Sequence, residues 1–173
     1  MADFETIISA ELSDDERSLL ATMMARLACA DGRIDPFETE FLNLFLGRAL
    51  GSDIAQAAKS LPDIPLSEVT RRGSANGQAI YTLCSLLTCV DEHVDDEERK
   101  LLTDYAQALG LSQSERETLD TVARRQILFQ SAEAMVNLPG YPPEKGTALA
   151  AIAGRLGATE QERDEVIDRF GFR

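Results

Sequence analysis

Six acidic residues occupy matching positions in two parts of the chain, and their carboxylates are of the kind that bind metal ions. The two sets lie 60 residues apart and consist of Asp31, Asp35 and Glu38, then Asp91, Asp95 and Glu98. Both follow the pattern Asp-x3-Asp-x2-Glu, with an aliphatic residue, Ile34 or Val94, before the second Asp. Carboxylates select hard cations such as Ca²⁺, Mg²⁺ or Mn²⁺. The pattern therefore predicts a divalent-cation site.

Helix capping explains part of this pattern without any ligand. Asp35 and Glu38 have the spacing of an N-cap residue and the third helical residue, which form a capping box, and Asp95 and Glu98 repeat it. Asp31 and Asp91 fall near the end of the preceding helix, where the helix dipole disfavours a carboxylate by roughly 0.3–1 kcal/mol. A bound cation, a buried arginine or a turn hydrogen bond would each compensate, and Asp31-Gly32 is also a common turn pair.

The first acidic turn is also similar to the second half of an EF-hand loop. The stretch from Asp31 to Glu38 matches loop positions five to twelve. Leu27 and Cys29 would then occupy positions one and three, and neither supplies a calcium ligand. A complete EF-hand is therefore excluded, and a weaker all-oxygen site shared between elements is the form of metal site that the sequence allows.

The elements that would position these acids are predicted to be helices. Apolar residues recur at helical spacing, as in Leu19, Leu20, Met23, Met24 and Leu27, whereas strand-like alternation persists nowhere. Capping boxes at Ser13, Ser112 and Thr159 predict helix starts, and Gly51, Gly110 and Gly157 predict helix ends. We expect a single all-α bundle of about seven helices over residues 1–173, including a long helix over about 114–138 and a last one over about 159–170.

An internal duplication relates the two acidic turns. At a shift of 60 residues, segments 22–42 and 82–102 share seven identities, including Cys29 with Cys89. The repeat units cover about 14–51 and 75–110, and each is predicted to form a helix, an acidic turn and a second helix. Because one helical hairpin cannot bury its apolar face alone, we expect the two to pack together. A fainter likeness predicts a degenerate third hairpin over 142–170.

Composition excludes several classes of protein. The chain of 173 residues has the length of one domain and carries 30 acidic against 17 basic residues, a formal net charge of −13. This charge argues against binding to nucleic acid or to anionic lipid, and it permits a cation or a basic protein partner. Apolar stretches are too short to cross a bilayer, and Met1 to Glu5 lack the basic region of a signal peptide. We expect a cytoplasmic protein without direct membrane insertion.

Sulfur and imidazole ligands are too few for a zinc site. Cys29, Cys84 and Cys89 form no CxxC pair, and His93 is the single histidine. The cysteines are expected to be reduced and buried in a helical core.

The acidic motifs resemble those of a known family. The string from Ala28 to Glu38, with Asp31-Gly32 and Ile34, looks like the signature ADGxIxxxE of the TerB-like tellurite-resistance domain, and residues 90–98 resemble that family's second acidic turn. The resemblance covers about residues 14–160 and departs from the family at Glu92, where glycine is expected. It implies an all-helical, pseudo-symmetric, non-enzymatic fold that binds or senses metal at the six acids. It further implies a link to tellurite resistance, to membrane-associated stress complexes and to a protein partner.

Two functions of different kinds follow from the sequence. The first is a cytoplasmic divalent-cation-binding sensor or adaptor that uses Ca²⁺, Mg²⁺ or Mn²⁺ as its cofactor. The alternative is a metal-free helical interaction module whose acidic face docks a basic partner. An enzyme is disfavoured, because His93 lies in a run of acids and the glycines around residues 73–77 lack the lysine of a phosphate-binding loop.

Overall fold

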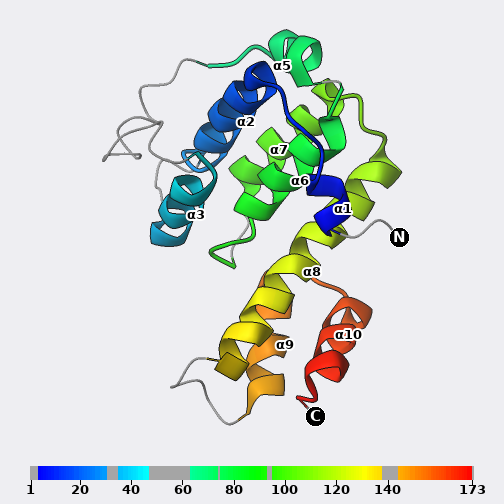
Figure 1. Ribbon diagram of the computed structural model, residues 1–173. Helices are drawn as coiled ribbons and strands as arrows, with labels where there is room; N and C mark the ends of the chain where they lie inside the picture. The colour runs from blue at the N-terminus through cyan, green and yellow to red at the C-terminus, as the bar shows by residue number, and fades with distance from the viewer. Residues whose placement is uncertain are drawn as a thin grey trace.

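Helices make up the regular structure of the described part of the chain, which contains no strand. The computed structural model describes residues 4–30, 35–46, 63–73, 75–92, 95–137 and 144–172. The helices in those ranges (Figure 1) are α1 Phe4–Ile8, α2 Asp14–Leu27, α3 Pro36–Leu46, α5 Leu66–Gly73, α6 Gly77–Leu87, α7 Asp96–Ala108, α8 Gln113–Asn137, α9 Lys145–Arg155 and α10 Glu160–Phe170. None of these helices combines the length and the apolarity that crossing a bilayer requires.

The described ranges contain nine helices, where the sequence predicts about seven. The two additional helices are α1, a single turn, and α5, which follows Pro65. The carbonyl of Pro65 accepts the first hydrogen bonds of α5, from the N–H groups of Glu68 and Val69. Proline lacks an N–H but is compatible with the start of a helix. The predictions for the long helix and for the last helix are confirmed within one residue at each end.

Local capping contacts fix the helix ends where the sequence places them. At Ser13, the backbone N–H donates to Glu16 Oε2 over 2.8 Å, and the N–H of Glu16 donates back to Ser13 Oγ over 3.3 Å. Thr159 forms the same box at the start of α10. Gly110 and Gly157 follow α7 and α9 with φ of 77° and 65°, the left-handed conformation of a glycine C-cap. Gly51 lies outside the described residues.

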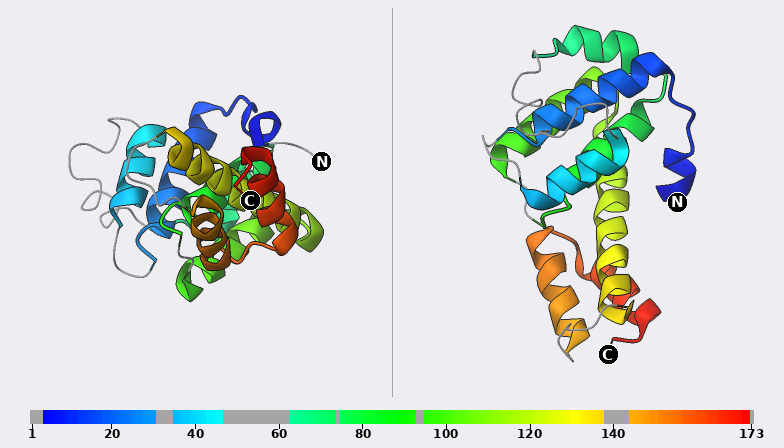
Figure 2. Two further views of the ribbon diagram at one scale, coloured as in Figure 1. Left: turned by 90° about the horizontal axis from the view of Figure 1, so that it is seen from below. Right: turned by 60° about the vertical axis from the view of Figure 1, so that its left-hand side comes forward.

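Two hydrophobic cores lie along the length of α8. This helix runs from α6 and α1 toward α9 and α10 (Figure 1). The first core joins α2, α5, α6 and α7 to the first half of α8, and the second joins the rest of α8 to α9 and α10. Leu87 of α6 belongs to the first core and its neighbour Leu86 to the second. The right-hand view in Figure 2 also shows α8 extending from the upper group of helices to α9 and α10.

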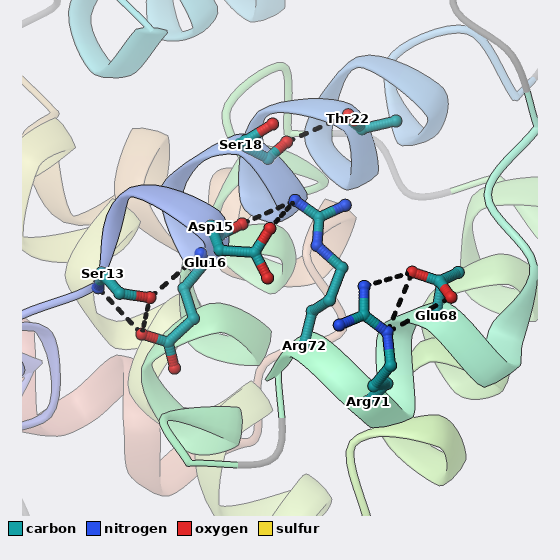
Figure 3. Close-up of polar contacts among 8 residues, drawn as sticks. All are labelled: Ser13, Asp15, Glu16, Ser18, Thr22, Glu68, Arg71 and Arg72. Carbon is teal, nitrogen blue, oxygen red and sulfur yellow. Dashed lines mark hydrogen bonds and ion pairs between the residues drawn. The ribbon is translucent and has the colours of Figure 1, made fainter.

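Polar contacts attach α5 to the start of α2 (Figure 3). Arg72 Nη2 donates to the carbonyl oxygen of Asp15 over 2.7 Å and pairs with the Asp15 carboxylate over 2.9 Å. Arg71, its neighbour, instead pairs with Glu68 on the same helix over 2.7 Å. The Arg72 side chain is only 15% exposed, so its contact with Asp15 is better shielded from solvent than that of Arg71.

The helix ends follow the 60-residue spacing of the acidic turns. The helices before the turns, α2 and α6, end at Leu27 and Leu87, and the helices after them, α3 and α7, begin at Pro36 and Asp96. Helix α2 packs on α6, as expected for two hairpins that bury their apolar faces against each other. The common origin of the two hairpins stays a prediction, as does the assignment of α9 and α10 to a third repeat.

Candidate metal centre

Five of the six predicted ligands lie in the described part of the chain, at two helix starts and one turn. Asp35 and Glu38 lie at the start of α3, Asp95 and Glu98 at the start of α7, and Asp91 in the turn after α6. Glu38 and Glu98 are buried, whereas the three aspartates are half-buried. Asp31 lies outside the described residues, as do the rest of 31–34 and residues 93–94, which include His93.

The four acids at the helix starts cap those helices, as the sequence predicts. The backbone N–H of Asp35 donates to Glu38 Oε2 over 2.8 Å, and that of Asp95 donates to Glu98 Oε2 over 3.2 Å. In return, Asp95 Oδ1 accepts from the N–H of Glu98 over 2.7 Å, and Asp35 Oδ1 accepts from Phe37 over 2.7 Å. These capping bonds use one oxygen of each carboxylate, so the second oxygen is not needed for capping.

Acids of both hairpins act on the buried carboxyl of Glu98. Burial is the main reason that the pKa of Glu98 is raised to about 8 from its ordinary value of 4.5, and the N–H of Asp95 acts in the opposite direction. The negative charges of Asp95, Glu38 and Asp91 raise the pKa further. Because such effects weaken with distance, the carboxylate of Glu38 lies within electrostatic range of Glu98.

Glu98 differs from two other buried glutamates that occupy the same capping position. Glu16 also accepts a hydrogen bond from Asn76 Nδ2 over 2.9 Å, and Glu162 pairs with Arg124 over 3.1 Å. Mainly the capping bonds, and to a smaller extent these second donors, lower the pKa of both carboxyls, whereas burial acts in the opposite direction. Glu98 has no comparable second donor in the described ranges, and its additional neighbours are acids. The ionised form of Glu98 is thus less favoured than that of the other two glutamates.

The donor chemistry fits a hard cation, although the described acids do not complete a site. The five described ligands offer only carboxylate oxygens, which Ca²⁺ and Mg²⁺ prefer. Among the residues that the structure describes, no group of three His, Cys, Asp or Glu side chains is placed to hold one metal ion. Mg²⁺ is commonly held by one or two carboxylates plus water, so a site with few protein ligands is chemically reasonable.

Glu92 adopts the conformation of the glycine that it replaces in the second turn. Its φ is 62°, a left-handed value uncommon for residues other than glycine. The carboxylate of Glu92 is ion-paired with Arg155 at the end of α9, and Arg155 Nε donates to it over 3.1 Å. The second turn therefore keeps a glycine-like backbone and gains a side chain that contacts the C-terminal helices.

Two of the three cysteines are as inert as the sequence predicts. Burial raises the pKa of the Cys84 thiol, and it raises that of Cys89 to about 12. Both thiols are therefore protonated near neutral pH. Cys29 is half-buried rather than buried, whereas Cys89, at the equivalent position in the turn after α6, is buried in the second core.

Sequence reasoning missed a group of arginines that the tertiary structure assembles. Helices α6, α7 and α8 and the end of α9 enclose a pocket of about 360 Å³, which is lined by Arg99, Arg116, Arg124 and Arg155. One signal was available in the sequence. Arg116, Asp120 and Arg124 are spaced four residues apart and therefore share a face of the long helix.

No family model, curated protein or solved structure matches this chain.

Proposed function

We propose that the protein is a non-enzymatic, TerB-like, divalent-cation-binding sensor or adaptor. The observation that carries this proposal is the environment of Glu98, a buried carboxyl group on which the charges of Glu38 and Asp91 act. The described contacts give it no second donor like those of Glu16 and Glu162. A bound divalent cation would supply the missing positive charge. The motifs of the acidic turns support the TerB-like assignment, and through it a role linked to tellurite resistance or to a membrane-associated stress complex.

Cation binding would couple the two hairpins. Glu38 belongs to α3 and Glu98 to α7, so an ion held between them links helices of both repeat units. Without the ion, the carboxylates repel one another, and this repulsion disfavours close approach of the two helix starts. Occupancy of the site would therefore change how firmly α3 is held, which is a simple basis for sensing.

The state of the buried thiols supports a non-enzymatic role. Cys84 and Cys89 are buried and protonated near neutral pH, so they do not provide a ready nucleophile. The capping bonds of the acids at the helix starts explain their positions without acid–base chemistry.

Calorimetric titration tests the proposal. We expect Ca²⁺, Mg²⁺ or Mn²⁺ to bind saturably at millimolar concentration at pH 8, and we expect the combined substitution Asp91→Asn with Glu98→Gln to abolish binding. Glu115→Gln is the matched control, because Glu115 caps α8 from the same position but is exposed and distant in sequence from both turns. Absence of saturable binding by the native protein, or equal loss in the control, contradicts the proposal.

One observation favours the metal-free interaction module as a second candidate. Phe37, at the start of α3, is 61% exposed although it is a large apolar side chain. Glu40, which follows Phe37 in α3, is an exposed acid. Asp96 and Glu97 at the start of α7 are exposed acids too. An apolar residue next to acids suits a basic amphipathic segment of a partner protein. Partner capture that depends on salt and on Phe37, but not on added cation, would favour this function over the first.

A further inference from the structure

A positively lined pocket stands out in a protein whose net charge is −13. Four arginines from three different helices, α7, α8 and α9, face one pocket of about 360 Å³, and Asp120 is its single acidic lining residue. That volume lies in the range of small-molecule sites. Hydroxyl groups of Tyr81, Ser85 and Thr103 also line it and add hydrogen-bonding capacity.

Two of the four arginines pair with acids outside the pocket lining. Arg124 pairs with Glu162, and Arg155 pairs with Glu92. Among the described residues, the lining itself contains four arginines and one acid, Asp120. Arginine therefore predominates in this lining, whereas acidic residues predominate in the protein as a whole.

Arg116 has a guanidinium donor that the described contacts leave unused. Its Nη1 donates to Thr103 Oγ1 over 3.2 Å, and the described contacts include no ion pair for it. Its Nε is buried and has no hydrogen-bond partner among the described residues. A buried guanidinium donor without an acceptor costs free energy, and an anionic ligand oxygen would satisfy it.

Asp120 is held in a fixed orientation on the same wall. Its Oδ1 accepts hydrogen bonds from Tyr81 Oη over 2.8 Å and from Ser85 Oγ over 2.9 Å. Both bonds use the same oxygen, so Oδ2 is not engaged by either group. A ligand hydroxyl or amino group could donate to that oxygen.

We propose that this pocket binds a small phosphate-bearing molecule through its four arginines. Planar guanidinium groups donate pairs of hydrogen bonds to phosphate oxygens. A doubly charged phosphate has more acceptor oxygens and more charge than a carboxylate, so it can bind several arginines at once. Nucleic acid is not the ligand, because a protein of net charge −13 repels an extended polyanion. Asp120 favours a ligand that also carries a hydroxyl or amino group.

Titration with inorganic phosphate and pyrophosphate tests this proposal on the full chain. We expect saturable binding of pyrophosphate by calorimetry, with amide shifts at Ser85, Thr103, Asp120 and Gly157. The substitution Arg116→Gln should weaken binding about tenfold or more, because a charged hydrogen bond is lost. If Arg116→Gln impairs folding, Arg99→Gln is the second variant, because Arg99 is an exposed residue of α7.

Two controls separate the pocket from general charge effects and from the cation site. Arg71→Gln removes an arginine of α5 that pairs with Glu68 outside the pocket and should bind pyrophosphate normally. The second control is titration of pyrophosphate without added divalent cation, so failure of the cation proposal leaves this test intact. The proposal is overturned by absence of saturable binding, by equal loss in Arg71→Gln, or by amide shifts confined to other parts of the chain.

Discussion

Glu92 combines a strained backbone with a tertiary contact. A left-handed φ costs a residue with a Cβ atom roughly 1–2 kcal/mol, a cost that glycine would avoid. The ion pair with Arg155 is partly exposed, so it offsets only a fraction of the strain. The side chain of Glu92 consequently links the second acidic turn to the end of α9.

Glu98 should make stability depend on pH with a definite sign. The folded protein keeps a proton on this carboxyl up to about pH 8, whereas the unfolded chain releases it near pH 4.5. Raising the pH between these values therefore favours the unfolded chain and lowers the free energy of unfolding, by roughly 2–4 kcal/mol in total. Thermal melts of the native protein and of Glu98→Gln in metal-free buffer measure this effect.

The variant provides the comparison for that prediction. Glu98→Gln keeps an oxygen for the N–H of Asp95 and removes the titrating charge, so its melting temperature should change much less between pH 5 and 8. If the melting temperatures of the native protein and the variant change equally with pH, the raised pKa of Glu98 is contradicted.

Helix ends in this protein are set by contacts within four residues of each end. The capping boxes at Ser13, Ser112 and Thr159 all form, and Gly110 and Gly157 both take left-handed φ values. The predicted boundaries agree with the structure because the partners are neighbours in sequence. Helix α5 was missed because it is short and follows a proline, and a contact from Arg72 to distant Asp15 attaches it to α2.

The capping box of α2 gives a test at the level of one helix. Ser13→Ala removes the acceptor for the N–H of Glu16 and should lower the free energy of unfolding by about 1 kcal/mol. Ser18→Ala is the matched control, because Ser18 is exposed within the same helix, where alanine is the better helix former (Figure 3). Urea denaturation measures both variants, and an equal effect of the two substitutions would count against the capping role.

At the scale of the whole molecule, α8 links the two hydrophobic cores. It is 25 residues long, contains neither glycine nor proline, and contributes Leu119 and Val122 to the first core and Leu128 and Met135 to the second. Partly buried Phe41 and Val90 pack against both cores. This continuity predicts that the described helices unfold together rather than as two independent units.

Leu128→Ala tests that cooperativity. Leu128 is fully buried in the second core, so its truncation should cost about 2–5 kcal/mol. If unfolding is cooperative, hydrogen exchange at α2 and α6 in the first core should accelerate to the same extent as exchange at α9. Unchanged protection of the first core, or two separate denaturation steps, would contradict the prediction.

The sequence by itself determines the all-helical class, most helix boundaries and the capping roles of Asp35, Glu38, Asp95 and Glu98. These features depend on side-chain periodicity and on contacts between residues three or four positions apart. Tertiary structure alone decided that Glu38 and Asp91 would act on Glu98, that Asn76 would donate to Glu16 and Arg124 would pair with Glu162, and that four dispersed arginines would line one pocket. The physical reason is that the energy of a buried charge depends on which groups packing places beside it, and those groups come from distant parts of the chain.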